Sequence, residues 1–472
     1  MTTTALPLPS ALPLPAAGAP RPVLVTAGAL GLAAAVVVPA GPPGVGVLLL
    51  GVATALGLRR LAPAPLRGWR AVHGLSSLAL LATVAVRDAP WVVTVCLLGA
   101  LAVASLAVTG GRTWVGMARG ALDLVLAAPR GSGWLGRGLM ALRPSAATAG
   151  PVTRGLGLSA VLVLVFGSLL ASGDAVFAAL LSRLVPDLPS TGHLPAYAVV
   201  LVVTAAAVAG AARLLLAPRP EPVLGPPARS LTRASEWLLP LAALDGLLLL
   251  WVGLQPAVLF GDAGHVLGTS GLSFAEHARE GFFQMVAVVV LVLAVVAAGV
   301  RWAPRSARPG LGMLCGLALL VDASAVHRLA LYADEFGLTR LRVATTTVAL
   351  WLAVVLLLVL VAGSRAPRAL PHLVVTSAVA GLLALVAANP DARIASSQLA
   401  RGDQADLAYV ATLSADVVPV LDRLAEPVRS CALAGRTGQV DGGWLSASVA
   451  RERAADLLAA RPVVPLSPVD CP

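Results

Sequence analysis

The stretch GLGMLCGLALLVDASAVHRLAL, residues 310–331, decides the fold class of this chain. It has the length that an α-helix needs to cross the hydrocarbon of a bilayer, roughly 17–25 residues, and most of it is apolar. It also holds Asp322, His327 and Arg328. An ionised group at mid-bilayer costs about 2.5–3.5 kcal/mol on insertion scales, so we expect this helix to lie inside a helix bundle and not against lipid.

The whole chain has the composition of a membrane protein. It contains 472 residues, of which 58% are hydrophobic and only 12% are charged, and its mean hydropathy is +0.88. One soluble core of this size does not carry that much apolar surface, so the lipid bilayer is the expected partner. The net charge of +11 does not indicate nucleic acid, because the arginines fall between apolar runs and not on one solvated face.

The basic residues are all arginine, and this excludes several classes of enzyme. The 34 Lys and Arg positions contain no lysine. A phosphate-binding loop lysine, a kinase lysine and a lysine Schiff base are therefore impossible.

Apolar runs predict an all-α, polytopic bundle of about 11 membrane spans. The GPPG turn at 41–44 makes the first two runs the weakest, and either could be a half-span. The predicted spans are 23–40, 43–58, 71–86, 90–109, 155–172, 195–217, 237–260, 283–300, 310–331, 343–363 and 372–388.

Composition divides the chain into three parts. Residues 1–22 are Pro-rich and predict a disordered cytoplasmic leader, residues 23–388 form the bundle, and residues 389–472 predict a small helical tail with Asp403 and Ser414 as N-caps. Within the bundle, 112–154 alternates apolar residues with arginine. This is typical of a cytoplasmic amphipathic helix at the membrane surface, with Trp114 and Trp134 at the interface; a partner-binding segment is the alternative.

The arginines also predict the orientation. With the N-terminus inside, 20 arginines lie in cytoplasmic segments and only 6 in the opposite loops. The chain is then a multi-pass protein of the cell membrane with a cytoplasmic N-terminus and an extracytoplasmic tail. Cys431 and Cys471 lie in that tail and form a candidate disulfide, whereas Cys96 and Cys315 sit singly in apolar runs as packing residues.

The intramembrane polar candidates are Asp245, Asp322, His327 and Arg328. Asp245 and Asp322 lie on separate predicted spans, where they either form a polar pathway or pair structurally with hydroxyls or arginine. Arg328 lies on a stripe near the outer interface, where it can snorkel. On the helix of Asp322, Gly312 and Gly316 form a small-xxx-small pair that would allow a close approach of another helix, and ordinary packing is the simpler reading.

Several stretches resemble one family when they are taken together: FGSLLASGDAVFA at 166–178, FAEHAREGFFQ at 274–284, YADEFGLTRLRV at 332–343, NPDARIA at 389–395 and LAYVATLSADVVPVL at 407–421. In this order they are similar to an uncharacterised family of bacterial polytopic membrane proteins, the group of the domains of unknown function 4153 and 4173. The resemblance implies the architecture and transfers no chemistry.

The resemblance also suggests that the outer-face segments at 274–284 and 332–342 act together with the start of the tail. Glu276, His277 and Glu280 could in principle hold a cation or act as acid and base, but this spacing lacks the two histidines of zinc sites, and helix capping is the simpler reading. We predict no metal and no cofactor. The outer-face candidates are Glu276, His277, Arg279, Glu280, Tyr332, Glu335 and Arg340.

Three functions remain open from the sequence. The first is a non-enzymatic envelope protein that organises or signals through a membrane or envelope protein partner, because no catalytic constellation is visible and no catalytic residue is assigned. The second is a secondary transporter or proton-coupled permease that uses Asp245 and Asp322. The third is a lipid-linked glycosyl or acyl transferase that uses Glu276, His277 and Glu280. The oligomeric state is unknown.

Overall fold

The protein is all-helical in a computed structural model, which describes residues 18–142, 194–221, 233–260, 274–436 and 443–464, and also 159, 162, 166, 167 and 170. The regular secondary structure of these residues consists of α-helices and short 3-10 helices, so the predicted helical class is confirmed. The predicted leader and most of the predicted span at 155–172 lie outside the described residues.

Seven helices among the described residues are long and apolar enough to cross a bilayer, as expected of a membrane-embedded protein. Three shorter helices pack beside them, and the last of these continues into η2 (Ala82–Ala85). The seven long helices are α4 (Pro90–Thr109), α8 (Leu194–Leu216), α9 (Ala234–Phe260), α11 (Phe274–Trp302), α12 (Arg308–Phe336), α13 (Arg340–Arg365) and α14 (Leu370–Ala387); the shorter ones are α1 (Arg21–Val37), α2 (Val45–Leu61) and α3 (Trp69–Leu81).

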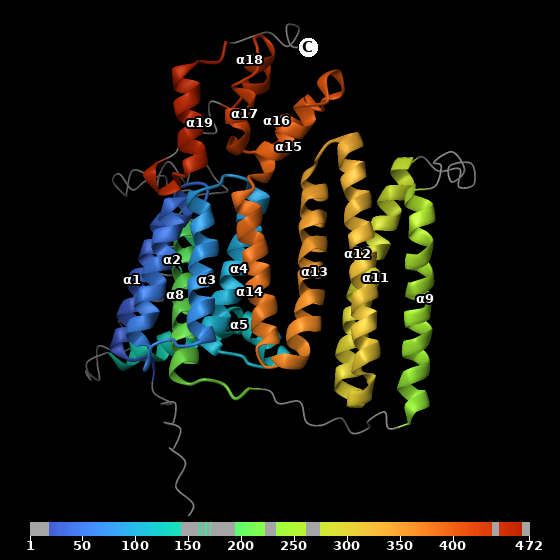
Figure 1. Ribbon diagram of the computed structural model, residues 1–472. Helices are drawn as coiled ribbons and strands as arrows, with labels where there is room; N and C mark the ends of the chain where they lie inside the picture. The colour runs from blue at the N-terminus through green and yellow to red at the C-terminus, as the bar shows by residue number, and fades with distance from the viewer. Residues whose placement is uncertain are drawn as a thin grey trace, which may run out of the picture.

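The helices form two groups that stand side by side (Figure 1). One group consists of α9, α11, α12 and α13 around a core that includes Val289, Leu314 and Leu356. The other contains α1 to α4, α8 and α14. The groups meet where α13 packs against α14. Large leucines point outward, such as Leu247 and Leu250 at 61% and 62% exposure, which is the surface that hydrocarbon covers in a membrane.

The helix that carries Asp322 is interior on only part of its surface. α12 packs against α9, α11 and α13, and Asp322 is 1% exposed. Leu320 and His327, seven residues apart and therefore on one face, are both exposed. The expectation that the whole helix is shielded is therefore wrong for that face, because its three neighbours cover only the opposite sides.

The amphipathic segment forms one helix, α5 (Trp114–Ala141), which lies across the ends of α1 and α8 (Figure 1). Its backbone touches that of α8. A Cβ added at Gly131 would lie 2.2 Å from the carbonyl oxygen of Ala206, and one at Gly210 would lie 2.8 Å from the backbone of Ala127. Small residues permit this crossing. Trp134 is buried at 3% exposure, so it is a packing residue and not the predicted interfacial anchor, whereas Trp114 is 52% exposed.

Gly312 and Gly316 show ordinary packing in the described part of the chain and no close approach of another helix. A Cβ at Gly316 would meet no atom within 4 Å, and one at Gly312 only the end of the Leu360 side chain at 4.0 Å. The sequence pattern is the same as at other glycines, but the neighbouring helices keep a larger distance here.

After α14 the chain breaks into short helices at the end of the bundle opposite α5; we call residues 389–472 the tail and the two ends of the bundle the tail end and the α5 end (Figure 1). Ile394, Val417, Leu421, Leu433 and Ala454 form a fully buried apolar cluster there. The helices of the tail are α15 (Pro390–Leu399), η5 (Gly402–Gln404), α16 (Leu407–Ala411), η6 (Ala415–Val417), α17 (Val418–Leu421), α18 (Val428–Leu433), η8 (Trp444–Ser446) and α19 (Val449–Ala460).

The N-caps of the tail differ from the predicted ones. Asp406 accepts a hydrogen bond from the N–H of Tyr409, and Ser448 accepts one from the N–H of Arg451. Ser414 precedes η6, but its side chain makes no capping bond and instead lies 3.2 Å from a carboxylate oxygen of Asp416. The hydroxyl of Ser414 donates a hydrogen bond to this carboxylate, which is a stronger acceptor than a backbone group. The side chain of Asp403 lies outside the described residues.

Candidate functional site at the junction of tail and bundle

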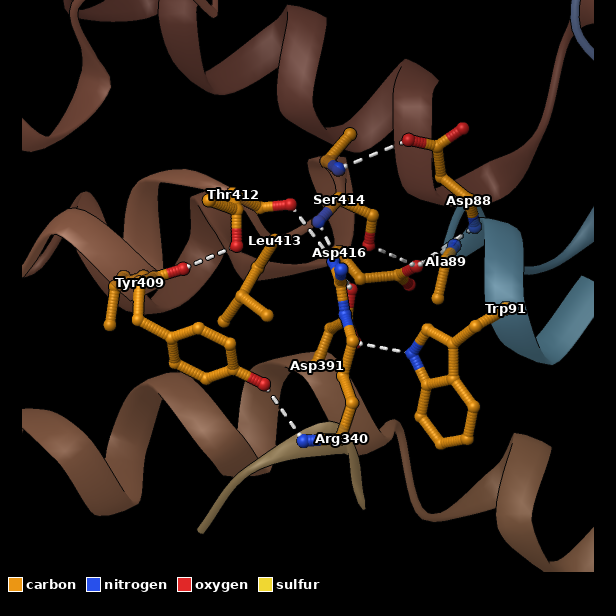
Figure 2. A network of polar contacts seen from close by, with 12 residues as sticks. Asp88, Ala89, Trp91, Arg340, Asp391, Tyr409, Thr412, Leu413, Ser414 and Asp416 are labelled. Carbon is orange, nitrogen blue, oxygen red and sulfur yellow. Dashed lines mark hydrogen bonds and ion pairs between the residues drawn. The ribbon is translucent and has the colours of Figure 1, made fainter. Parts of the chain in front are cut away.

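The carboxylate of Asp416 binds the backbone just before α4. Its Oδ2 accepts hydrogen bonds from the N–H of Asp88 at 2.8 Å and of Ala89 at 3.0 Å (Figure 2). Ala89 stands at the N-cap and has no side chain that could cap, so the tail supplies the negative group that this helix end favours. Burial raises the pKa of the Asp416 carboxyl, and the two N–H donors and Arg87, 3.4 Å away, oppose that shift.

Asp88 makes the equivalent contact in the opposite direction, because its carboxylate binds the backbone of the tail. Its Oδ2 accepts a hydrogen bond from the N–H of Ala415 at 3.1 Å, at the start of η6, and its Oδ1 lies 2.6 Å from Nε of Arg451. Two aspartates more than 300 residues apart in sequence therefore each bind the backbone beside the other. Such an exchange fixes both the distance and the register of the two segments.

Asp391 joins three segments. It is fully buried in α15; one carboxylate oxygen accepts from the indole N–H of Trp91 at 2.9 Å and the other from the N–H of Ser414 at 3.0 Å. Arg340, at the start of α13, lies 3.6 Å from the second oxygen. These donors replace the hydration that the carboxylate loses on burial.

Arg340 connects α13 to the tail through its backbone and its side chain. Its N–H donates to the hydroxyl of Tyr409 at 2.8 Å, and its Nη2 donates to the carbonyl of Thr412 at 2.9 Å (Figure 2). Arg436, 4% exposed, donates to four carbonyl groups between Val410 and Ser414. Burial lowers the pKa of Arg436, and Asp391 raises it.

The loop between α12 and α13 is held to α15. The side-chain amide of Gln398 donates to the carbonyl of Leu338 at 2.8 Å, and the N–H of Leu338 donates to the hydroxyl of Ser397 at 3.0 Å. Gly337 has φ +72°, and a Cβ there would lie 2.8 Å from Nε2 of Gln398. Only glycine combines this backbone conformation with so close a contact.

A second clamp ties α19 to the turn between α1 and α2. Arg451 donates to the carbonyl of Pro43 at 3.0 Å and to that of Ser446, in addition to its ion pair with Asp88. The N–H of Val45 donates to the carbonyl of Ala447 at 2.9 Å. The GPPG turn is therefore bound to the tail.

We call Asp88, Asp391, Asp416, Arg340 and Arg451 the junction network. The three carboxylates are each engaged by N–H donors, so none is available as a general base or a metal ligand in this arrangement. Among the described residues, no group of three or more His, Cys, Asp or Glu side chains could hold a metal ion. The junction network connects the tail to α4, to α13 and to the turn between α1 and α2.

Of the predicted outer-face residues, Arg340 belongs to the junction network and Tyr332 lies close to it. The guanidinium of Arg342 lies 4.3 Å from the centre of the Tyr332 ring, which also packs against Phe336 at 4.8 Å. Glu335 is exposed. The side chains of Glu276, His277, Arg279 and Glu280, in the first turns of α11, lie outside the described residues.

The two intramembrane acids lie apart. Asp245 is 7% exposed and faces the start of α12, since a Cβ at Gly310 would lie 3.7 Å from its Oδ2. Asp322 follows Gly310 by twelve residues, roughly 18 Å along the helix axis. Oδ1 of each aspartate is buried without a hydrogen-bond partner in the described part of the chain. His327 is exposed and Arg328 is half-buried.

The cysteines follow the predicted division between packing and cross-linking. Cys96 and Cys315 are buried free thiols. Cys431 is disulfide-bonded, and Cys471 lies outside the described residues, so the pairing of these two remains a prediction.

Sequence reasoning missed most of the junction network. Asp88, Asp391 and Asp416 were not singled out, although Asp391 lies in NPDARIA and Asp416 in LSADVVPVL, two of the stretches that carry the family resemblance. An aspartate directly after an apolar run, as at RDAPW around Asp88, was the available signal, because such a residue sits at a helix end.

The comparisons with known proteins agree with the resemblance. The model of a family described as a domain of unknown function, DUF4153, matches residues 75–424. No curated protein and no solved structure matches the chain. The matched range contains Asp88, Asp391 and Asp416 and ends before Arg451.

Proposed function

The chain belongs to the DUF4153 family, and we propose that it is a multi-pass protein of the cell membrane that organises or signals in the envelope. In this proposal the tail forms an extracytoplasmic helical domain, and its free surface binds another envelope protein. The chain acts through this contact and not as an enzyme.

The observation that carries the proposal is the reciprocal contact of Asp88 and Asp416. A tail that served only as a flexible extension would need no buried, charge-assisted connection to the bundle. Here the tail is bound to α4, to α13 and to the α1–α2 turn. A force or a partner on the tail therefore acts on several spans at once.

The proposed orientation rests on the arginine distribution. The arginine-rich segments lie at the α5 end, and retention of basic residues in the cytoplasm makes that end the inner one. The tail is then outside, where the disulfide of Cys431 is chemically stable. With this orientation we propose eleven spans in total.

The experiment uses a photo-crosslinking residue in the full-length protein in native membranes. It is placed at Arg453 or at Asp456, two exposed positions of α19. We expect a discrete adduct with another envelope protein at one of these positions. The control position is Leu250, an outward leucine of α9 that should react with lipid alone. If the tail positions give only the pattern of Leu250, the proposal fails.

A second candidate, a proton- or cation-coupled transporter, is favoured by the buried carboxylate oxygens of Asp245 and Asp322 that have no hydrogen-bond partner among the described residues. Intramembrane acids in transporters take up such ions. The test is the double variant Asp245→Asn, Asp322→Asn in a deletion strain. Full rescue of the deletion phenotype by this variant would rule the transporter out.

A further inference from the structure

A cavity of about 670 Å³ opens at the α5 end of the bundle, far from the junction network. It lies where α3 and α14 begin and α4 ends, next to the segment after α8. Its volume is in the range of sites that take small molecules. The lining residues are Arg67, Gly68, Trp69, Arg70, His73, Gly110, Arg112, Thr113, Glu221, Arg368, Ala369 and His372.

Two charged residues of the lining build its wall. Arg70 donates from Nε to the carbonyl of Ala107 at 2.9 Å and from Nη2 to that of Val108 at 2.7 Å, and so caps the end of α4. Glu221 accepts from the N–H groups of Arg112 and Thr113 at 2.7 and 2.6 Å, at the start of α5. Both side chains are committed to helix ends.

Three other arginines of the lining do not bind a helix end through their side chains. Arg67, Arg112 and Arg368 are exposed, and their guanidinium groups make no ion pair or hydrogen bond among the described residues. Arg112 also interacts electrostatically with the carboxylate of Glu221, the one acidic group in the described lining of this cavity. They come from three separate segments, before α3, before α5 and before α14. The neighbouring cavity of about 220 Å³ differs, because there Arg219 is neutralised by Asp123 at 2.5 Å.

The inner part of the cavity is formed by two histidines and a tryptophan. Nε2 of His73 lies 3.0 Å from Nδ1 of His372, and the ring of Trp69 stacks on His372 at 4.8 Å with an angle of 5° between the planes. His73 is 1% exposed, and its Nδ1 has no hydrogen-bond partner among the described residues.

We propose that this cavity binds a phosphate-bearing anion between Arg67, Arg112 and Arg368. Arginine recognises phosphate through paired N–H donors. Three guanidinium groups without an ion pair around one cavity, against the single carboxylate of Glu221, suit an anion with several anionic oxygens. The position at the end of the spans suits the headgroup of an anionic phospholipid, and the same chemistry fits a free phosphate compound. This site is independent of any role of the tail.

The test measures the thermal midpoint of the purified full-length protein in neutral detergent at 150 mM salt, with increasing amounts of a probe. One probe is phosphatidylglycerol, its reference is phosphatidylcholine, and a third is inorganic phosphate. A ligand that binds the folded state raises the midpoint with concentration. A saturable shift with phosphatidylglycerol alone identifies a lipid headgroup, and one with inorganic phosphate identifies a free anion.

The variant Arg67→Gln, Arg368→Gln should lower the affinity for the probe by about tenfold or more, because the charge-assisted hydrogen bonds of two guanidinium groups to the phosphate are lost. Neither side chain makes a hydrogen bond or an ion pair among the described residues, so the midpoint without probe should stay near the wild-type value. The matched control is Arg305→Gln, Arg308→Gln, which removes two exposed arginines from the other helix group and should leave the affinity unchanged.

Replacement of Arg67 and Arg368 by lysine should restore part of the affinity, because the charge returns without the paired donors. Equal affinity in wild type and in the Arg67→Gln, Arg368→Gln variant would overturn the proposal. The absence of a saturable shift with either phosphate probe, or a shift by an acidic peptide alone, would overturn it as well.

Discussion

Carboxylates carry most of the junction between tail and bundle at the scale of single residues. A buried carboxylate is costly unless its lone pairs are satisfied, and the N–H groups around Asp416 and Asp391 meet that condition. Each of these residues therefore stabilises the fold only while its partners stay in place. Removal of one member leaves the others unsatisfied.

The variant Asp416→Ala should loosen the tail. It leaves the N–H groups of Asp88 and Ala89 without their acceptor and Arg87 without its ion pair, a loss of about 2–4 kcal/mol. We expect protease to release the tail from the purified protein much faster than in the wild type. The control is Asp456→Ala, which replaces an exposed aspartate of α19 and should behave like the wild type.

The carboxyl group of Glu426 should make the stability of the tail around α18 depend on pH. Hydrogen bonds from Ser430 and Arg429 lower the pKa of its carboxyl below the usual value. A lowered folded-state pKa contributes stability above the unfolded-state pKa, and this is lost as the pH falls through the folded-state value. Hydrogen exchange in α18 should therefore accelerate at acid pH beyond its intrinsic change. The same dependence in Glu426→Gln would contradict this assignment.

The crossing of α5 over α8 depends on glycine at the scale of elements. The two helices approach through Gly131 and Gly210, and buried alanines on α8 complete the contact. An amphipathic helix at the membrane surface would not need glycines on its inner face. Their positions indicate that α5 is part of the packed bundle.

Gly131→Ala should destabilise the protein, because the new Cβ would lie 2.2 Å from the oxygen of Ala206. We expect a cost of about 1–3 kcal/mol, seen as a lower thermal midpoint in detergent. Gly136→Ala in the same helix meets no atom within 4 Å among the described residues and should be neutral or stabilising by up to about 1 kcal/mol. Equal midpoints for the two variants would show that α5 and α8 do not cross so closely.

Two functional regions lie at opposite ends of the whole molecule. The junction network is at the tail end, and the cavity with its arginines is at the α5 end. Among the described residues, the spans between them are packed in two groups whose main contact is that of α13 with α14. This separation means that each end can be tested without disturbing the other.

The orientation can be tested with single cysteines at the two ends. Asp456→Cys lies in α19, and Arg305→Cys lies in the turn η4 (Arg305–Ala307) before α12. A membrane-impermeant maleimide should label Asp456→Cys in intact spheroplasts and Arg305→Cys only after permeabilisation. The native thiols Cys96 and Cys315 are buried and should give little background. The reverse pattern would invert the proposed topology.

Much of the architecture followed from the sequence alone. Apolar runs of bilayer length gave the helices, and ten of the eleven predicted runs coincide with helices of the structure. This works because backbone groups in lipid must be satisfied within each span, so local composition decides the element. A helix in the 112–154 segment was expected from its composition, but its close packing on α8 and the burial of Trp134 were not. The family resemblance agrees with the family model that matches residues 75–424.

What the sequence could not determine was which polar residues meet. Asp88 and Asp416, or His73 and His372, are each about 300 residues or more apart, and nothing in their local patterns distinguishes them from solvated side chains. Conversely, the sequence left open whether Asp245 and Asp322 form one pathway, and the packing of α9 on α12 places Asp245 beside Gly310, twelve residues before Asp322. Span formation is a property of a segment and its solvent, whereas a site depends on contacts between segments, which only the tertiary structure decides.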